Sequence, residues 1–266
     1  MALVLAAVAG PSLWLQRNVV DQDGFVALAG PLGGDKEFQE SLTTLLSGQA
    51  AASLNLPSFL NKLAVEIINS AAQNIYSDPG YPQAWSETLQ RSHALTFAAA
   101  GKSEVAEDLQ LDLAPLVDLV AAKVTADVGA TVPIPKEVVV GMEQPQIARA
   151  LPLAVTLGGW SGWMVFIAVD LLALGVIVAR RRALTVVASG VGLGIVALLW
   201  LLASGAAQRY LSALVLGPGS ATQIGAQVAE LARDSWQGGI TLTFVLAGVV
   251  AAVGVASLVV GRRRTT

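Results

Sequence analysis

His93 is the only histidine in the chain, and histidine is the side chain most often used for proton transfer near neutral pH. A zinc site built from several histidines, or from histidine and cysteine, is excluded because the chain has no second histidine and no cysteine. His93 also shares a predicted helix face with Trp85 and Leu89. We therefore expect a buried histidine with a hydrogen-bond partner, with a catalytic role as the alternative.

Four carboxylates crowd one short stretch: Glu104, Glu107, Asp108 and Asp112. Such a group can bind calcium or supply an acid–base pair, but its spacing matches no EF-hand loop. A charged strand edge explains the same residues, since charge there discourages pairing with strands of other molecules. We favour the charged edge over a metal site.

No other motif carries chemistry. The serines form no Gly-x-Ser-x-Gly elbow, and the glycine-rich turn 217–220 lacks the lysine of a phosphate-binding loop. We predict a protein that is not an enzyme, with no catalytic residue, no metal ligand and no cofactor.

Asp170 is the strongest candidate for a functional residue. It lies in the middle of the apolar segment 160–179, where a charge costs at least ~2.5 kcal/mol, and no basic residue of the chain reaches that depth. The carboxyl must be protonated, hydrogen-bonded to Ser189 or Ser257, or paired with a cation of another subunit. We consider an intramembrane contact with a partner subunit, a structural hydrogen bond and an ion or substrate path.

Small residues recur at helical spacing in the same apolar segments, and such stripes let helices approach closely. We expect them to pack within one bundle of helices. The candidate packing positions are Gly158, Gly162, Gly190, Gly194, Gly248 and Ala252.

These residues sit in a chain with 54% hydrophobic and only 13% charged side chains, which is typical of a membrane protein. Segments 160–179, 183–202 and 240–260 are each long enough to span a bilayer. Arginine triplets at 180–182 and 262–264 place both of these points in the cytoplasm by the positive-inside rule. Four tryptophans then fall at the outer ends of the spans, as an aromatic belt would: Trp160, Trp163, Trp200 and Trp236.

The apolar stretch at 1–16 is short for a membrane span, and no basic residue precedes it as in a signal peptide. We favour a first membrane helix whose start lies upstream of Met1. The alternative is a cleaved signal with the small residues Ala7 and Ala9 at its end.

The region 17–149, about 130 residues, is predicted to be an extracytoplasmic α+β domain that is mainly helical. Hydrophobic spacing predicts helices over 35–52, 57–75, 82–100 and 115–124, and strands near 109–113 and 138–140. The region carries 16 acidic against 8 basic residues, which argues against nucleic acid as a partner. The region 150–266 then holds three transmembrane helices, with an outer loop at 205–238 that contains an amphipathic helix. We expect this helix to pack on protein and not on lipid.

One resemblance follows from particular residues: Trp14 with Val20, Asp21 and Phe25, then Asp35 and Leu42, Ala84-Trp85, the run Arg91 to Leu95, and Leu111-Asp112-Leu113 before Pro115. Over about residues 11 to 210 the chain resembles uncharacterised actinobacterial integral membrane proteins that have a large extracytoplasmic domain between the first and second transmembrane helices. The resemblance implies this layout and an actinobacterial cell envelope. It implies no activity.

We therefore expect a multi-pass protein of the plasma membrane, a non-enzymatic scaffold, assembly factor or regulatory subunit. Its partners would be the lipid bilayer and other membrane or envelope proteins. An accessory or permease-like component of a transporter is the alternative, although three arginines between two spans leave little for a cytoplasmic ATPase to bind.

The predicted orientation can be tested with reporter fusions at residues 60, 182 and 225. Only the fusion at 182 should report a cytoplasmic location, because only that position borders an arginine triplet. Any other pattern contradicts the topology.

Overall fold

The computed structural model describes residues 1–54, 66, 69–100, 109–128, 138–141, 145–214 and 220–263. Four of its helices are long and apolar enough to cross a membrane, over Ala2–Val20, Ala148–Val178, Arg182–Ala206 and Glu230–Val260. By length and composition the chain is thus a multi-pass membrane protein. It divides into two compact units, which we describe separately.

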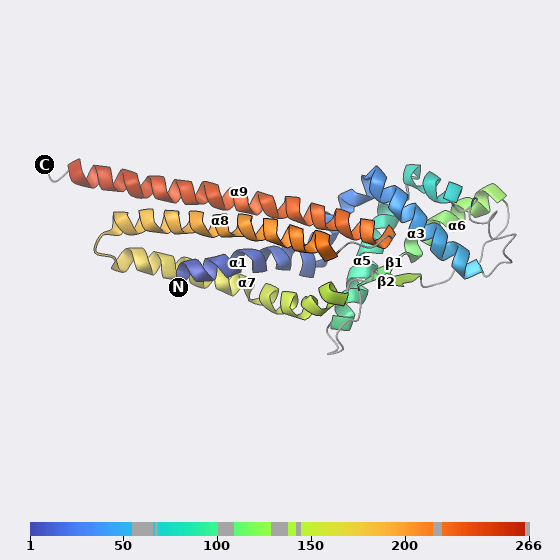
Figure 1. Cartoon of the computed structure of the whole chain (residues 1–266), viewed down its shortest axis with the longest axis horizontal. Helices are drawn as coiled ribbons and strands as arrows, with labels where there is room; N and C mark the ends of the chain where they lie inside the picture. The colour runs from blue at the N-terminus through green and yellow to red at the C-terminus, as the bar shows by residue number, and fades with distance from the viewer. Residues whose placement is uncertain are drawn as a thin grey trace. The chain divides into compact units, whose positions relative to one another are not determined.

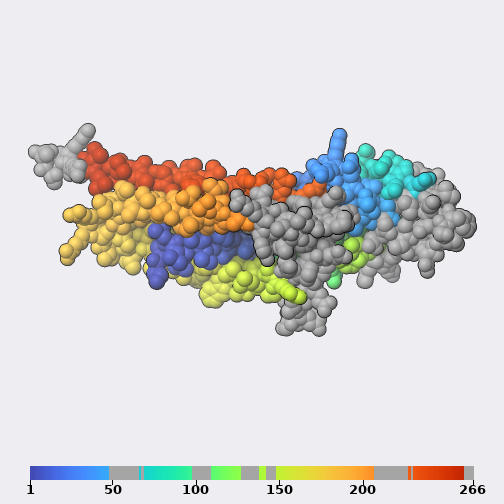
Figure 2. Space-filling model, in the orientation of Figure 1, coloured from blue at the N-terminus to red at the C-terminus, as the bar shows by residue number. Residues whose placement is uncertain are grey.

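The first unit, called here the apolar bundle, contains Met1–Arg17, Ala154–Leu214 and Ala232–Thr266. Its helices belong to α1 (Ala2–Leu15), α7 (Pro145–Val178), α8 (Arg182–Leu214) and α9 (Ser220–Arg263). They lie side by side in Figure 1. Figure 2 shows α1, in dark blue, against the orange surface of α8.

The amino-terminal helix is longer than the sequence predicts. A π-helical segment, Gln16–Val20, continues α1 without a break, so the apolar helix reaches 19 residues. That length suffices to cross a slightly thinned bilayer. The described chain therefore has four candidate spans, where hydropathy alone assigned three firmly.

A proline fixes how α1 meets α8. Pro11 lies inside α1 and has no N–H, so the carbonyl of Ala7 loses its partner within the helix. The indole Nε1 of Trp200 donates a hydrogen bond of 2.9 Å to that carbonyl. Gly10 makes room for the ring, since a Cβ there would lie 2.2 Å from the Trp200 ring. Trp200 thus replaces the hydrogen bond that Pro11 removes.

Two more tryptophans extend this joint to α9. The ring of Trp236 lies 5.4 Å from that of Trp200 and 5.9 Å from that of Trp14, and Trp14 Nε1 donates to Ser235 Oγ at 3.2 Å. Trp200 and Trp236, which the sequence predicts to lie in an aromatic belt, are half-buried in this joint. Trp160 and Trp163 are each 64% exposed, as belt residues would be.

Helices α8 and α9 approach closely through glycine. A Cβ on Gly190 would lie 2.5 Å from the backbone nitrogen of Ala251 and 2.8 Å from the Ala247 carbonyl oxygen. One on Gly254 would lie 2.7 Å from the backbone nitrogen of Val187. These contacts leave no room for a side chain at either glycine.

The predicted small-residue stripes are partly displaced by one position. On α9 the contact residues are Ala247, Ala251 and Gly254; Gly248 meets nothing within 4 Å among the described residues, and Ala252 is exposed. One residue is a rotation of about 100° around the helix, so the predicted stripe faces away from α8.

The other candidate positions divide in the same way. The side chain of Gln16 occupies the space beside Gly158 on α7, since a Cβ on Gly158 would lie 2.5 Å from Gln16 Oε1. Gly162, in contrast, meets nothing within 4 Å in the described chain. The buried residue next to Gly162 is Ser161, one position away. Gly194 makes only an ordinary contact, 3.9 Å from Ala247 Cβ.

The second unit, called here the inserted domain, comprises Asn18–Leu153 and Val215–Leu231. Its described helices and strands run in the order α2, η2, α3, η3, α5, β1, α6 and β2, the η elements being short 3₁₀ helices. Their bounds are Gln22–Ala29, Gly30–Gly34, Lys36–Leu54, Ile75–Ser77, Tyr81–Ala100, Gln110–Asp112, Ala114–Val128 and Val139–Gly141.

These elements match most of the predicted ones, because local capping signals define them. Asp35 Oδ1 accepts from Phe38 N at 2.9 Å and starts α3, and Asp21 Oδ1 accepts from Gly24 N at 2.8 Å and starts α2. Strands β1 and β2 pair antiparallel, with Leu111 opposite Val140. The helix predicted over 57–75 lies mostly outside the described residues.

The core of the inserted domain centres on Trp85 of α5. Its indole donates to the Gly30 carbonyl at 3.1 Å, and its ring lies 5.2 Å from that of Phe38, which is 1% exposed. A Cβ on Gly33 would lie 2.5 Å from the Trp85 ring. Gly33 of η2 therefore lets the chain pass closely against this tryptophan.

The region 205–238, predicted as an outer loop with an amphipathic helix, contains more helix than predicted. In its described part it is helical, because α8 continues to Leu214 and α9 begins at Ser220 and runs to Arg263 without a break. Val228 and Leu231 pack against the core of the inserted domain, which agrees with the prediction that this amphipathic stretch packs on protein.

The glycine contact between α8 and α9 predicts a contrast between two identical substitutions. Gly190→Val should lower the free energy of unfolding by about 1–3 kcal/mol, since backbone atoms of α9 occupy the space that the side chain needs. Gly248→Val should have little effect, because that position is open. Thermal unfolding of both variants in the same detergent measures the difference. Equal unfolding temperatures would contradict the assigned helix contact.

Candidate functional site

Asp170 lies on the outward face of α7. Its side chain is exposed, and it forms no hydrogen bond or ion pair with any residue that the structure describes. The two serines considered as partners do not reach it, and the Ser257 hydroxyl donates instead to the Val253 carbonyl at 2.8 Å. The structural hydrogen bond expected as one alternative is therefore not formed within the described chain.

The direction of Asp170 follows from the buried side of α7. Within the apolar bundle, Gly158, Ser161 and Ala168 of α7 are buried, at intervals of about one and two helical turns. Asp170 follows Ala168 by two residues, which is about 200° around the helix. The carboxylate thus points away from the side of α7 that packs in the bundle.

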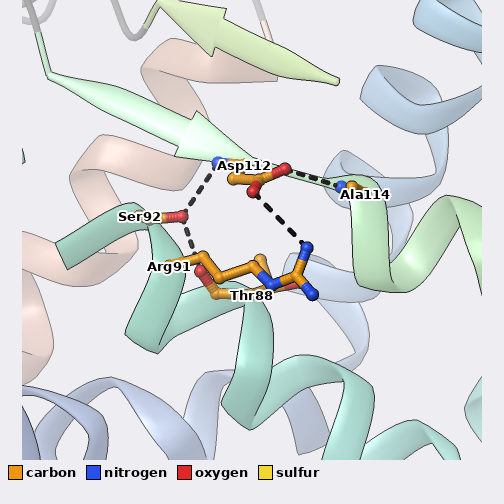
Figure 3. A network of polar contacts seen from close by, with 5 residues as sticks. All are labelled: Thr88, Arg91, Ser92, Asp112 and Ala114. Carbon is orange, nitrogen blue, oxygen red and sulfur yellow. Dashed lines mark hydrogen bonds and ion pairs between the residues drawn. The ribbon is translucent and has the colours of Figure 1, made fainter. Parts of the chain in front are cut away.

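In the inserted domain, polar side chains gather around Asp112 at the end of β1 (Figure 3). The Asp112 backbone N–H donates to Ser92 Oγ at 2.9 Å, and Ser92 Oγ donates to the Thr88 carbonyl at 2.6 Å. Asp112 Oδ1 accepts from Ala114 N at 3.0 Å, and Oδ2 lies 3.9 Å from the Arg91 guanidinium.

This arrangement ties α5 to β1 and caps the start of α6. The carboxylate is 12% exposed and already engaged, and the guanidinium is 52% exposed at a long distance, so the ion pair adds little. Asp112 is thus a structural residue. The other three carboxylates of its predicted cluster, Glu104, Glu107 and Asp108, lie outside the described residues.

His93 is a buried core histidine, as expected. It is 8% exposed, and its Nε2 forms a hydrogen bond of 3.0 Å with the Val19 carbonyl. Its ring stacks on Phe97 with centroids 4.3 Å apart and lies 5.3 Å from Phe25. The Val19 carbonyl accepts, so this ring nitrogen carries the proton.

Two buried tyrosines lie edge to face in the same domain, with ring centroids 5.0 Å apart. Tyr76 OH donates to the Gln39 carbonyl and is bonded to Thr43 Oγ1, both at 2.7 Å, whereas Tyr81 OH is buried with no hydrogen-bond partner among the described residues. Burial raises the pKa of both phenols, and the neighbouring Tyr76 raises the pKa of Tyr81 further.

The surface of the inserted domain is acidic where the structure describes it. Exposed carboxylates outnumber exposed basic side chains, of which Lys36, Arg91 and Arg149 are the described examples. Asp21 and Asp35 also cap helices, whereas the others in this group project without such a role. The exposed acidic residues are Asp21, Asp23, Asp35, Glu37, Glu40, Glu66, Asp118 and Glu230.

Among the residues that the structure describes, no group of three or more histidine, cysteine, aspartate or glutamate side chains is placed to hold a metal ion. The chain matches no family model, and comparison with curated proteins and with solved structures gave no match either. The resemblance stated from the sequence therefore stays a prediction.

The tyrosine pair predicts opposite effects of the same substitution. Tyr81→Phe should leave the free energy of unfolding unchanged or raise it by up to about 1 kcal/mol, because it removes a buried hydroxyl without a partner. Tyr76→Phe should lower it by about 1 kcal/mol, because Thr43 and the Gln39 carbonyl lose their partner.

The pH dependence follows from the raised pKa values. Below the unfolded value of about 10 both phenols are neutral in both states, so their contribution is constant. Above it the unfolded chain releases the protons first, and the free energy of unfolding falls as pH rises. Denaturant unfolding of the full chain between neutral and alkaline pH measures this fall. It should shrink in Tyr81→Phe, and an unchanged profile would contradict the assignment.

Proposed function

We propose that this protein is a non-enzymatic scaffold, assembly or regulatory subunit of the cell envelope, which binds its partners through the inserted domain on the outer side of the membrane. The observation that carries the proposal is the exposed acidic surface of a folded domain inserted between apolar helices. Such a surface fits a partner with a basic surface.

The proposed orientation is supported by charge placement. Arg180 and Arg181 form the turn between α7 and α8, and Arg182 begins α8, whereas the described surface of the inserted domain is acidic. Arginine is retained on the cytoplasmic side during insertion, so the inserted domain belongs outside. The exposed Trp160 and Trp163 lie near the middle of α7, at the start of the apolar segment 160–179 and away from the arginines that follow it, where an outer interface would be.

The alternative, an accessory or permease-like component of a transporter, is less well supported. A permease that is driven from the cytoplasm needs a surface for an ATPase, and the turn between α7 and α8 spans only Ala179 to Arg181. The actinobacterial envelope implied by the resemblance is compatible with the proposed role and is part of the proposal.

The proposal predicts that partner binding depends on the acidic residues of α2 and α3. We would purify the tagged full chain from mild detergent, together with the variant Asp23→Asn, Glu37→Gln, Glu40→Gln. The amount of envelope protein that co-purifies with the variant should be at least about tenfold lower than with the unmodified chain, since charge complementarity would be lost. The isosteric amides keep the shape of the side chains.

A second triple variant, Glu66→Gln, Glu87→Gln, Asp118→Asn, removes the same charge elsewhere on the domain and is the matched control. Its partner recovery should stay close to that of the unmodified chain. The proposed role of the acidic surface is wrong if no envelope protein is recovered. It is also wrong if the amount recovered with each triple variant equals that recovered with the unmodified chain. Recovery of an ATPase that depends on the arginine turn would favour the transporter alternative.

A further inference from the structure

An apolar surface surrounds Asp170 on the outside of α7. Trp163 and Phe166 are 64% and 60% exposed, and their rings lie edge to face with centroids 6.3 Å apart. Leu174 and Ile177 are 56% and 64% exposed on the other side of the carboxylate. These positions recur every three or four residues and so share one helix face. We call this surface the Asp170 face: Trp163, Phe166, Ile167, Asp170, Leu174 and Ile177.

A carboxylate in this position is unfavourable in a bilayer. Ionisable side chains within membrane spans almost always point into a bundle or pair with another group. Asp170 points away from the packed side of α7 and has no hydrogen-bond or ion-pair partner among the described residues. Within the described part of a single chain, the Asp170 carboxylate therefore lacks the polar partner that it needs in a membrane.

We propose that the Asp170 face docks a transmembrane helix of another protein, which carries a lysine or arginine near the middle of the membrane. Opposite charges attract strongly where water is excluded, and pairing removes the cost of burial for both groups. Gly162 meets nothing within 4 Å in the described chain and lies one turn before Phe166, so it lets the partner backbone approach.

A second copy of this chain fits the face less well. The segments 160–179, 183–202 and 240–260 contain no lysine, arginine or histidine, and the only such residue at 1–20 is Arg17, near the end of that helix. A second copy could offer only another carboxyl at this depth, and two like groups disfavour each other's charge. Charge complementarity therefore selects a different, basic partner helix.

This inference rests on the proposed insertion into the membrane, but it does not depend on the acidic surface of the inserted domain. The two proposals can fail separately. Loss of partner binding in the variant Asp23→Asn, Glu37→Gln, Glu40→Gln tests only the inserted domain. The experiment below instead uses a probe that consists of a membrane helix alone.

The full chain is reconstituted in phosphatidylcholine vesicles with a synthetic transmembrane helix of leucine and alanine that has one central lysine. The chain has no cysteine, so a single introduced thiol carries the fluorophore for energy transfer. The lysine helix should associate at least about tenfold more tightly than the same helix with leucine at the centre. Asp170→Asn should abolish this preference, and Val169→Leu, an exposed neighbour, should keep it.

A charge exchange separates pairing from a general effect on folding. Asp170→Lys should prefer a probe helix with a central aspartate over the lysine helix, which a merely misfolded variant would not do. The proposal is overturned if lysine and leucine probes associate equally with the unmodified chain. It is also overturned if two labelled copies of the chain associate through Asp170 in preference to the lysine probe, since the face would then belong to a second copy.

Discussion

The apolar bundle depends on one constraint: inside a membrane, a backbone carbonyl cannot find water, so it must find a donor within the protein. Pro11 frees the Ala7 carbonyl in the middle of α1, and Trp200 of α8 supplies the missing donor. This hydrogen bond depends on Gly10, since only a residue without a side chain leaves space for the Trp200 indole at that position. This joint sets where α1 lies along α8.

Other contacts of the bundle extend from this joint. Trp236 packs beside Trp200 and Trp14, so α9 joins the same cluster, and Gly190 and Gly254 bring α8 and α9 together further along. Aromatic packing and close approach replace the hydrophobic effect, which gives little driving force between helices in lipid. The bundle thus uses two kinds of contact, one polar and aromatic, the other between small residues.

Sequence reasoning succeeded where a local signal determines the structure. Asp35 and the proline after Leu113–Ala114 mark helix starts that the structure contains, and the alternation around Leu111 predicts the strand that pairs with Val140. Buried His93 is likewise predicted by its helix face. In each of these cases the deciding residues are neighbours in sequence.

The sequence does not predict contacts that depend on a segment far away in the chain. Pro11 implies that the Ala7 carbonyl has no partner within its helix. No nearby residue identifies the donor, Trp200, which lies 193 residues further along the chain. The small residues of α9 reveal that a helix can approach, yet Gly248 and Ala247 are equally small and face directions about 100° apart. The amphipathic helix predicted within 205–238 continues directly into the following apolar segment as one helix, Ser220–Arg263, which the separate amphipathic and apolar patterns do not reveal.

The residues that carry the sequence resemblance have mainly structural roles. Asp21 and Asp35 cap helices, Phe25 packs on His93, Trp85 holds η2, and Ser92 bonds to Asp112. A motif of this kind preserves a domain and does not by itself specify chemistry.

The two units differ in how they tolerate unfavourable polar groups. The inserted domain buries the hydroxyls of Tyr81 and Thr88 without partners in the described part of the chain. A core with Phe38, Leu42 and Leu116 almost fully buried offsets that cost. The outward face of α7 has no such compensation, because Asp170 is surrounded by side chains that would contact lipid. A neutral hydroxyl can stay unpaired inside a well-packed core, but a carboxylate at mid-membrane depth needs a partner, and this difference makes Asp170 the more informative residue about function.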